Sequence, residues 1–217
     1  MKKYLIRQII ILIIGLILLF CGMCIASALT NWVEEAYALD RCQDYVTDIR
    51  IQHCKYFGLS FPYWYGVGQA KQESNCRADI TAFDAGMGLT QFMPATWKMV
   101  EGHIGKLNPY NPENSIRAQA WYMWQLQKEN WDGRLFLAYM FYNSGFGTIR
   151  KEYLRSVSVY HCKSADYELM KLVCKRRVLA LKNGRLLDLC QVGYDYPKQI
   201  YKYSQKYKLF ADDWRYW

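Results

Sequence analysis

Apolar residues in this sequence recur at helical intervals over much of its length. Ile116, Ala120, Met123 and Gln127 follow one another at spacings of 4, 3 and 4 residues, which places them on one side of a helix. A second run of this kind lies between residues 135 and 142. No segment shows the sustained two-residue alternation of a half-buried strand. Because 52 % of the residues are hydrophobic, a sizeable core is possible, and we predict one all-α domain.

Capping residues and prolines predict where several helices begin. Ser60 can cap a helix that has Pro62 in its first turn, and this helix carries Glu73 at its C-terminal end. Asn111 and Pro112 form the same kind of start for a later helix. We expect helices over residues 32–52, 60–74, 94–100, 112–128, 134–143 and 165–182.

A long apolar run follows several basic residues at the N-terminus. It extends from Ile9 to Leu29 and is interrupted only by two glycines and a serine. A run of about 20 residues can span a bilayer, and its positive flank should stay in the cytoplasm. The sequence at 26–28, Ala-Ser-Ala, also fits the exit of a cleaved signal peptide. We interpret residues 1–31 as an uncleaved membrane anchor, with a signal peptide as the alternative; either one exports residues 30–217.

The cysteines beyond the apolar run indicate disulfides rather than a metal site. Cys21 and Cys24 lie inside the run, where we interpret their C-x-x-C spacing as chance. The other six are Cys42, Cys54, Cys76, Cys162, Cys174 and Cys190. An even number in an exported domain is typical of disulfides, and six cysteines allow 15 pairings. Full pairing would need a bridge between the two ends of the domain. The three histidines have no ligand spacing, so we expect no metal and no cofactor.

Charge and aromatic content narrow the class of partner. The net charge is +9, which suits an anionic membrane surface or an acidic polymer as well as nucleic acid. The only dense basic run is at 175–177, so we exclude nucleic acid as a partner. Aromatic residues make up 17 % of the chain. Such rings can stack on sugar faces, although most of them are expected to fill the core.

The stretch from Gln72 to Pro94 combines a carboxylate with a glycine-bearing turn. Glu73 is expected at a helix C-terminus, where the negative end of the dipole opposes its ionisation. Burial there would raise its pKa further and suit an acid that holds its proton near neutral pH. Gly86 and Gly88 permit a tight turn and close approach to a long, hydroxyl-rich substrate. The simpler alternative is an exposed glutamate beside an ordinary turn.

Four sequence blocks in the same order resemble the lysozyme-like soluble lytic transglycosylase family, also called the SLT domain family. They are Glu73-Ser74, Gly88-Leu89-Thr90-Gln91-Phe92-Met93-Pro94, Asn111-Pro112-Glu113-Asn114-Ser115-Ile116 and Ala138-Tyr139-Met140-Phe141-Tyr142-Asn143-Ser144-Gly145. The resemblance covers about residues 60–152. It implies an all-α, lysozyme-like (goose-type/SLT) helical domain behind the N-terminal segment.

The resemblance also implies roles for individual residues. Glu73 would be the catalytic residue. The residues expected to contact substrate are Ser74, Thr81, Gln91, Met93, Tyr142 and Asn143. The alternative role of Ser74 is to brace the helix that carries Glu73. The alternative role of Met93 is packing in the hydrophobic core. The family commonly has a serine where this chain has Ala82, and Thr81 beside it could supply the hydroxyl. The family's closing Glu-Thr-Arg block is replaced by residues 194–199, which puts its contact with the cleft in doubt.

The expected organisation has four parts. Residues 1–31 are the anchor or signal peptide, 32–153 the catalytic domain, 154–193 a cysteine-containing insertion and 194–217 a C-terminal helix that completes the domain. The resemblance implies an enzyme that cleaves peptidoglycan glycan strands between N-acetylmuramic acid and N-acetylglucosamine and leaves a 1,6-anhydro end. The alternatives are a lysozyme-type hydrolase, in which Asp79 or Asp84 holds a water, and a non-catalytic glycan-binding scaffold.

The expected location follows from the anchor. Residues 9–29 would cross the inner membrane once and place the catalytic domain in the periplasm. An anchor joined to one catalytic domain suits local opening of the wall for a secretion, conjugation or phage-entry apparatus.

Overall fold

The computed structural model describes residues 41–130, 133–161, 163, 167–175, 178–180 and 186–212. The chain divides into two compact units, Met1–Gln43 and Asp44–Trp217, and the fold given below is that of the second unit. The predicted anchor or signal peptide at residues 1–31 lies outside the described residues. Within the described ranges, no helix is long and apolar enough to cross a membrane.

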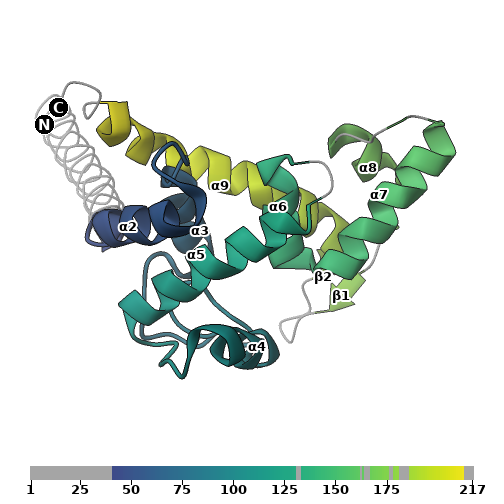
Figure 1. Ribbon diagram of the computed structural model, residues 1–217. Helices are drawn as coiled ribbons and strands as arrows, with labels where there is room; N and C mark the ends of the chain where they lie inside the picture. The colour runs from purple at the N-terminus through teal and green to yellow at the C-terminus, as the bar shows by residue number, and fades with distance from the viewer. Residues whose placement is uncertain are drawn as a thin grey trace, which may run out of the picture. The chain divides into compact units, whose positions relative to one another are not determined.

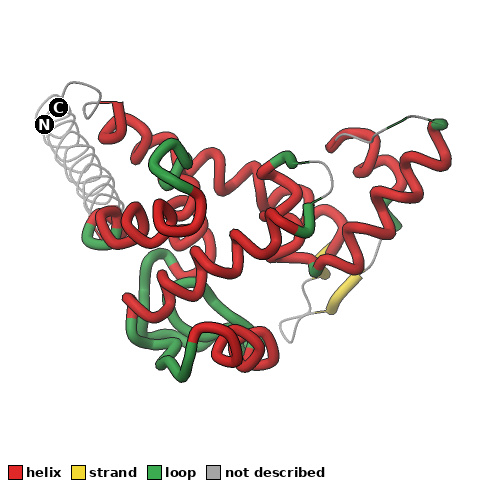
Figure 2. Tube along the Cα trace, viewed as in Figure 1, coloured by secondary structure: helices red, strands yellow, loops and turns green. Residues whose placement is uncertain are grey.

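The second unit is mostly helical, as the sequence predicted (Figures 1 and 2). Its elements are α2 (Val46–Phe57), α3 (Trp64–Ser74), α4 (Pro94–Ile104), α5 (Pro112–Lys128), α6 (Leu135–Ser144), α7 (Phe146–Tyr160), α8 (Tyr167–Val173), β1 (Val178–Ala180), β2 (Leu186–Asp188) and α9 (Leu189–Asp212). The two strands pair antiparallel, with Leu179 opposite Leu187.

The antiparallel pair of β1 and β2, a β-hairpin, shows that two predictions are wrong. The unit is not purely α-helical, and the helix predicted over 165–182 is wrong because α8 ends at Val173 and β1 begins at Val178. The strands have only three residues each, too few for a two-residue period to be recognised. The sequence Asn183-Gly184 lies between them, and Asn-Gly between short apolar runs is a strong hairpin signal.

Other helix boundaries also differ from the prediction. α3 begins at Trp64 with Tyr63 as its N-cap and no side-chain cap, so Ser60 does not cap it. In place of one helix over 32–52, α2 begins at Val46 after a turn, and residues 32–40 lie outside the described part of the chain. The start of α5 is as predicted, because the Asn111 side chain accepts a hydrogen bond from the Asn114 N–H and Pro112 is the first helical residue.

Helices α3 and α9 pack along each other and form the most extensive helix contact of the unit (Figure 1). Gly68 of α3 makes this close approach possible. A Cβ atom at this position would lie 2.6 Å from the Ile200 carbonyl oxygen and 3.1 Å from the Ser204 Cβ. A helical glycine lowers helix stability, so its presence here is explained by the packing of α9 against α3. The contact holds the C-terminal helix against the helix that carries Glu73.

Two hydrophobic clusters among the described residues pack the elements around the candidate site. The larger joins α5, α6 and α7 to α9 and includes the buried Leu137, Phe141 and Ile200. The smaller packs Phe92 and Trp97 against α5. Together they fix the positions of α3, α6 and the loop before α4, which are the elements that meet at the candidate site.

A disulfide joins the end of α8 to the start of α9, within the predicted insertion at residues 154–193. Cys174 follows α8 and Cys190 lies in the first turn of α9, and the two are bonded. Cys76 is also in a disulfide, as is Cys42 of the first unit, whereas Cys54 is a free thiol. The prediction of disulfides is therefore confirmed, but full pairing of the six cysteines is not found. Cys162 lies outside the described residues.

Candidate active site

Helix α3 ends immediately after Glu73. The C-cap residue Asn75 has a left-handed backbone with φ 55°, which stops the helix and turns the chain. Ser74 is buried, and its hydroxyl donates a hydrogen bond of 2.7 Å to the Leu89 carbonyl. The same hydroxyl accepts a 3.0 Å bond from the Arg77 N–H. Ser74 therefore ties the end of α3 to the glycine-bearing turn, which corresponds to its predicted bracing role rather than to substrate contact.

The turn between residues 80 and 92 contains one position, 88, whose backbone conformation and close surroundings allow only glycine. Gly88 has φ +69°, and a Cβ atom there would lie 2.0 Å from the Pro109 carbonyl oxygen. The Gln91 amide donates to the Gly88 carbonyl at 2.6 Å and to the Ile80 carbonyl at 3.4 Å. These bonds hold the Gln91 side chain in place and leave its carbonyl oxygen as the group that can accept a hydrogen bond from a ligand.

The end of α6 supplies Tyr142 and Asn143. The Tyr142 hydroxyl donates a 2.7 Å hydrogen bond to the Thr90 carbonyl, and its ring packs edge-on to Phe92 with ring centres 5.5 Å apart. Burial raises the pKa of Tyr142 well above its usual value, and the nearby Glu73 charge adds to this rise. Tyr142 therefore stays protonated, and its hydrogen bond and ring contact hold the end of α6 against the turn.

These elements enclose a polar cavity of about 210 Å³. Its lining residues are Glu73, Ala82, Phe83, Asp84, Gly86, Gln91, Met93, Tyr142 and Asn143. The structure thus brings together Glu73 with four of the predicted substrate-contacting residues. Thr81 is not among the lining residues; its hydroxyl is hydrogen-bonded to the Tyr110 hydroxyl at 2.8 Å, and Ala82 lines the cavity instead.

The cavity keeps the Glu73 carboxyl protonated near neutral pH. Burial raises the pKa of Glu73 to about 8; a hydrogen bond from Tyr196 opposes the rise, and the Asp84 carboxylate adds to it. A carboxyl group loses hydration when it is buried, and this disfavours its charged form. A group with such a pKa can give up a proton and take one back near neutral pH, as general acid–base catalysis requires.

Tyr196 is a site residue that the sequence analysis missed. Its hydroxyl donates a hydrogen bond to Glu73 Oε1 and accepts one of 3.3 Å from the Gln69 side-chain amide. The Gln69 carbonyl in turn accepts a 2.9 Å bond from the Gln119 side chain. Helices α3, α5 and α9 are therefore linked by a buried chain of polar groups that ends at Glu73. Within residues 194–199, whose contact with the cleft was in doubt, Tyr196 reaches Glu73 but is not among the residues that line the cavity.

Phe83 and Asp84 were also missed as lining residues, although Asp84 was considered for holding a water. The Phe83 side chain is 83 % exposed at the cavity. An exposed aromatic ring beside a polar cavity offers a stacking surface to a ligand. The Asp84 carboxylate accepts a 3.3 Å hydrogen bond from the Gly86 N–H. Neither residue has a periodicity or motif signal, because both lie in an irregular loop. Asp79 does not line the cavity.

The sequence matches one known protein family. Residues 67–159 match the family model described as "Transglycosylase SLT domain". This match confirms the resemblance predicted from the sequence blocks: residues 67–159 are similar to the SLT domain family. Glu73 and the other lining residues all fall within the matched range. Tyr196 lies beyond it. A comparison with curated proteins finds no match.

Solved structures share the fold. The crystal structure of the 70 kDa soluble lytic transglycosylase Slt70 from Escherichia coli aligns with a TM-score of 0.55 at 18 % sequence identity. The complex of the 70 kDa soluble lytic transglycosylase with bulgecin A aligns with a TM-score of 0.55 at 19 % identity. Each alignment covers 74 % of this chain and 24 % of the other. This chain therefore spans about a quarter of the length of those proteins, and the likeness shows that it shares their fold over the aligned part.

Proposed function

We propose that this protein is a lytic transglycosylase. Its substrate would be the peptidoglycan glycan strand, cleaved between N-acetylmuramic acid and N-acetylglucosamine with formation of a 1,6-anhydro end. The observation that carries the proposal is the Glu73 carboxyl, whose pKa is raised to about 8 in a polar cavity within the SLT domain. That cavity also presents Gln91, Tyr142 and Asn143 to a ligand.

In the first step, the protonated Glu73 donates its proton to the glycosidic oxygen as the bond to the anomeric carbon breaks. An acid with a pKa near the working pH is protonated in the resting enzyme and still a good donor. The sugar's own acetamide stabilises the positive charge that develops at the anomeric carbon. The Tyr196 hydroxyl, already hydrogen-bonded to Glu73, stabilises the carboxylate that remains.

In the second step, the muramoyl 6-hydroxyl attacks the anomeric carbon. The Glu73 carboxylate takes the proton of that hydroxyl and returns to its starting state. The 1,6-anhydro bridge is formed, and no water is consumed. One carboxyl group therefore serves as acid and then as base, whereas most glycoside hydrolases use two.

A lysozyme-type hydrolase is the second candidate, because Asp84 lines the same cavity as Glu73. A second carboxylate could hold a water for attack on the anomeric carbon. Asp84 is exposed and accepts a hydrogen bond from the Gly86 N–H within its own loop. This solvated position favours a turn residue over a general base, so we place the transglycosylase first.

Muropeptide analysis of digested sacculi tests the proposal. The wild-type protein should produce anhydromuramic ends, and Glu73→Gln should lower the rate by about 10²–10⁴-fold, the range typical of a lost general acid–base group. Asp84→Asn should keep most of the activity. Reducing ends together with a large loss in Asp84→Asn would favour the hydrolase. Wild-type activity in Glu73→Gln would refute the assignment of the acid.

A non-catalytic glycan-binding scaffold is the alternative from another class. The retained Glu73 and its raised pKa argue against it, because a binding protein has no need of a protonated carboxyl in its cleft. Bulgecin A, bound by the 70 kDa relative, is a useful probe. Its binding to Glu73→Gln would show that the cavity remains folded in a variant that no longer cleaves.

The proposed location is the periplasmic side of the inner membrane, with residues 9–29 as the anchor. The disulfides fit an oxidising compartment. Local opening of the wall for a secretion, conjugation or phage-entry apparatus is the proposed context. Fractionation of cells, with and without residues 1–31 replaced by a cleavable signal peptide, tests the anchor.

A further inference from the structure

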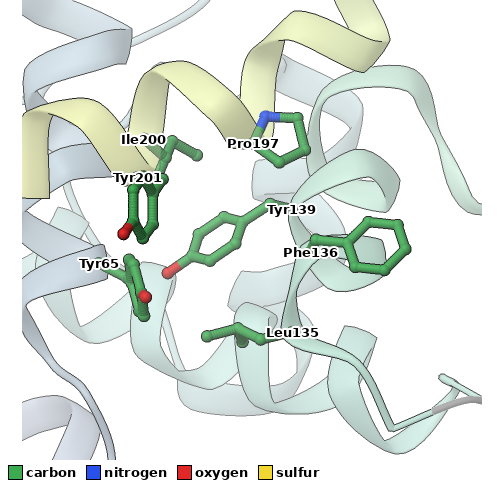
Figure 3. A pocket seen from close by; sticks show the side chains of 7 residues that line it. All are labelled: Tyr65, Leu135, Phe136, Tyr139, Pro197, Ile200 and Tyr201. Atoms are coloured by element: carbon green, nitrogen blue, oxygen red, sulfur yellow. The ribbon is translucent and has the colours of Figure 1, made fainter. Parts of the chain in front are cut away.

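A second cavity lies on α3, α6 and α9 and shares no lining residue with the Glu73 cavity (Figure 3). Its volume is about 140 Å³, and its lining residues are Tyr65, Leu135, Phe136, Tyr139, Pro197, Ile200 and Tyr201. An engineered cavity of about 150 Å³ accommodates one benzene molecule. The second cavity is therefore large enough for a small group and too small to enclose a whole sugar.

The hydroxyl of Tyr139 is buried without a hydrogen-bond partner among the described residues. Its side chain is 3 % exposed. Figure 3 shows the ring directed across the cavity, with its hydroxyl end towards Tyr65. A buried hydroxyl that makes no hydrogen bond destabilises the fold, and such groups in native proteins require an explanation. A ligand that accepts a hydrogen bond from Tyr139 would provide one.

The other residues that line the cavity determine the charge and polarity that a ligand must have. None of them carries a charge at neutral pH, so a buried ammonium or carboxylate would lose its hydration without a partner. The Tyr65 and Tyr201 rings lie 6.4 Å apart with an angle of 30° between their planes. Tyr201 is 57 % exposed and offers an aromatic face beside the cavity. The cavity therefore suits a neutral group that has an apolar end and one hydrogen-bond acceptor. The ring of the ligand to which this group is attached would lie outside the cavity, against Tyr201.

We propose that this cavity binds the acetamido group of an N-acetylated amino sugar in a glycan strand. The methyl group would pack against Phe136 and Ile200, and the carbonyl oxygen would accept a hydrogen bond from Tyr139. The sugar ring would lie against Tyr201. The choice of a glycan as the source of this group rests on the proposed function, but the site is separate from the catalytic cavity. Binding at this second cavity would keep the enzyme attached to the cell wall between cleavage events.

Ring resonances of ¹³C-labelled tyrosine, assigned by substitution, test the site directly. The protein carries Glu73→Gln, and the probes are a tetramer of N-acetylglucosamine and the tetramer of unacetylated glucosamine. The acetylated tetramer should shift the resonances of Tyr65, Tyr139 and Tyr201, and the glucosamine tetramer should leave them unchanged. Equal shifts with both probes, or none at millimolar concentrations, would overturn the proposal.

Two variants and a control complete the test. Tyr139→Phe should weaken binding, read from the Tyr65 and Tyr201 shifts, by about tenfold, because it removes one hydrogen bond. Its melting temperature should stay the same or rise, which separates lost binding from lost folding. Tyr201→Ala should also weaken binding, whereas Tyr160→Ala, a change of a similarly exposed tyrosine outside both cavities, should not.

Unchanged affinity in Tyr139→Phe would also overturn the proposal. Such a result would leave the proposed function untouched, because anhydromuramic ends produced by the wild-type protein are measured independently.

Discussion

Tyr196 and Glu73 are 123 residues apart in the sequence and share a hydrogen bond in the structure. The bond joins the closing helix α9 to the end of α3. Because the tyrosine hydroxyl donates to the carboxylate, it favours the ionised form of Glu73 and opposes the effect of burial on the pKa. The closing helix thus sets how readily Glu73 releases its proton.

Replacement of Tyr196 by Phe should change the pH dependence of cleavage. The pKa of Glu73 should move above its present value of about 8, so the fall in kcat at high pH should occur at higher pH. The maximal kcat should decrease by about tenfold or more, because a hydrogen bond to a charged group contributes about 1.5–3 kcal/mol. The measurement is kcat against pH on a soluble glycan substrate.

Tyr203→Phe is the matched control, since Tyr203 also lies on α9 and does not line the Glu73 cavity. A Tyr196→Phe profile that superimposes on the wild-type profile would show that this hydrogen bond does not control the proton of Glu73.

His53 should make the fold sensitive to acid. Its ring is buried, its Nδ1–H donates to the Ile49 carbonyl, and its Nε2 has no partner among the described residues. Burial lowers the pKa of His53 to about 4, partly offset by the backbone hydrogen bond. The neutral ring stabilises the fold above its unfolded pKa of about 6.5, and this contribution is lost as the pH falls towards 4. The linked loss is about 3 kcal/mol by pH 4.

Urea unfolding at a series of pH values between 7 and 4 measures this effect. His53→Gln should flatten the curve over that interval, whereas His103→Gln, a change of an exposed histidine on α4, should not. An equally steep loss of stability in His53→Gln would assign the acid sensitivity to other groups.

Gly88 and Gly102 should respond in opposite directions to replacement by Ala. Gly88→Ala would place a Cβ atom 2.0 Å from the Pro109 carbonyl oxygen at a positive φ. We expect a loss of about 3 kcal/mol or more in unfolding free energy, together with reduced activity, because the turn holds Gln91. Gly102 lies within α4 with open space around it, so Gly102→Ala should stabilise the protein by about 0.5–1 kcal/mol. Stable folding of Gly88→Ala would contradict the close approach.

The sequence predicted those parts of the site that depend on local signals or on the resemblance. The start of α5 followed from the Asn111 cap and Pro112, and the matched blocks placed Glu73 with Gln91 and Tyr142. Tyr196 could not be found in this way. It lies among several tyrosines of one helix, and only the packing of α9 on α3 decides which of them reaches Glu73.

The differences have similar physical causes. Ser60 is a good capping residue, but the hydrogen-bonded turns at Phe61 and Tyr63 precede the helix, and α3 starts later. Thr81 was favoured for its hydroxyl, and that hydroxyl is hydrogen-bonded to Tyr110 on a distant loop, which leaves its predicted contact with substrate a prediction. Both cases involve a tertiary or turn contact, which a single sequence does not reveal.

The disulfide between Cys174 and Cys190 should stabilise the segment that carries the β-hairpin. The two residues are 16 positions apart, and closure of a loop of about 15 residues contributes about 3 kcal/mol in the chain-entropy description. The double variant Cys174→Ser, Cys190→Ser should therefore lose about 2–4 kcal/mol and be cut faster by trypsin between α8 and α9. Cys54→Ser removes the free thiol and should change neither quantity. Equal trypsin sensitivity in the double variant and the wild-type protein would show that packing alone holds this segment.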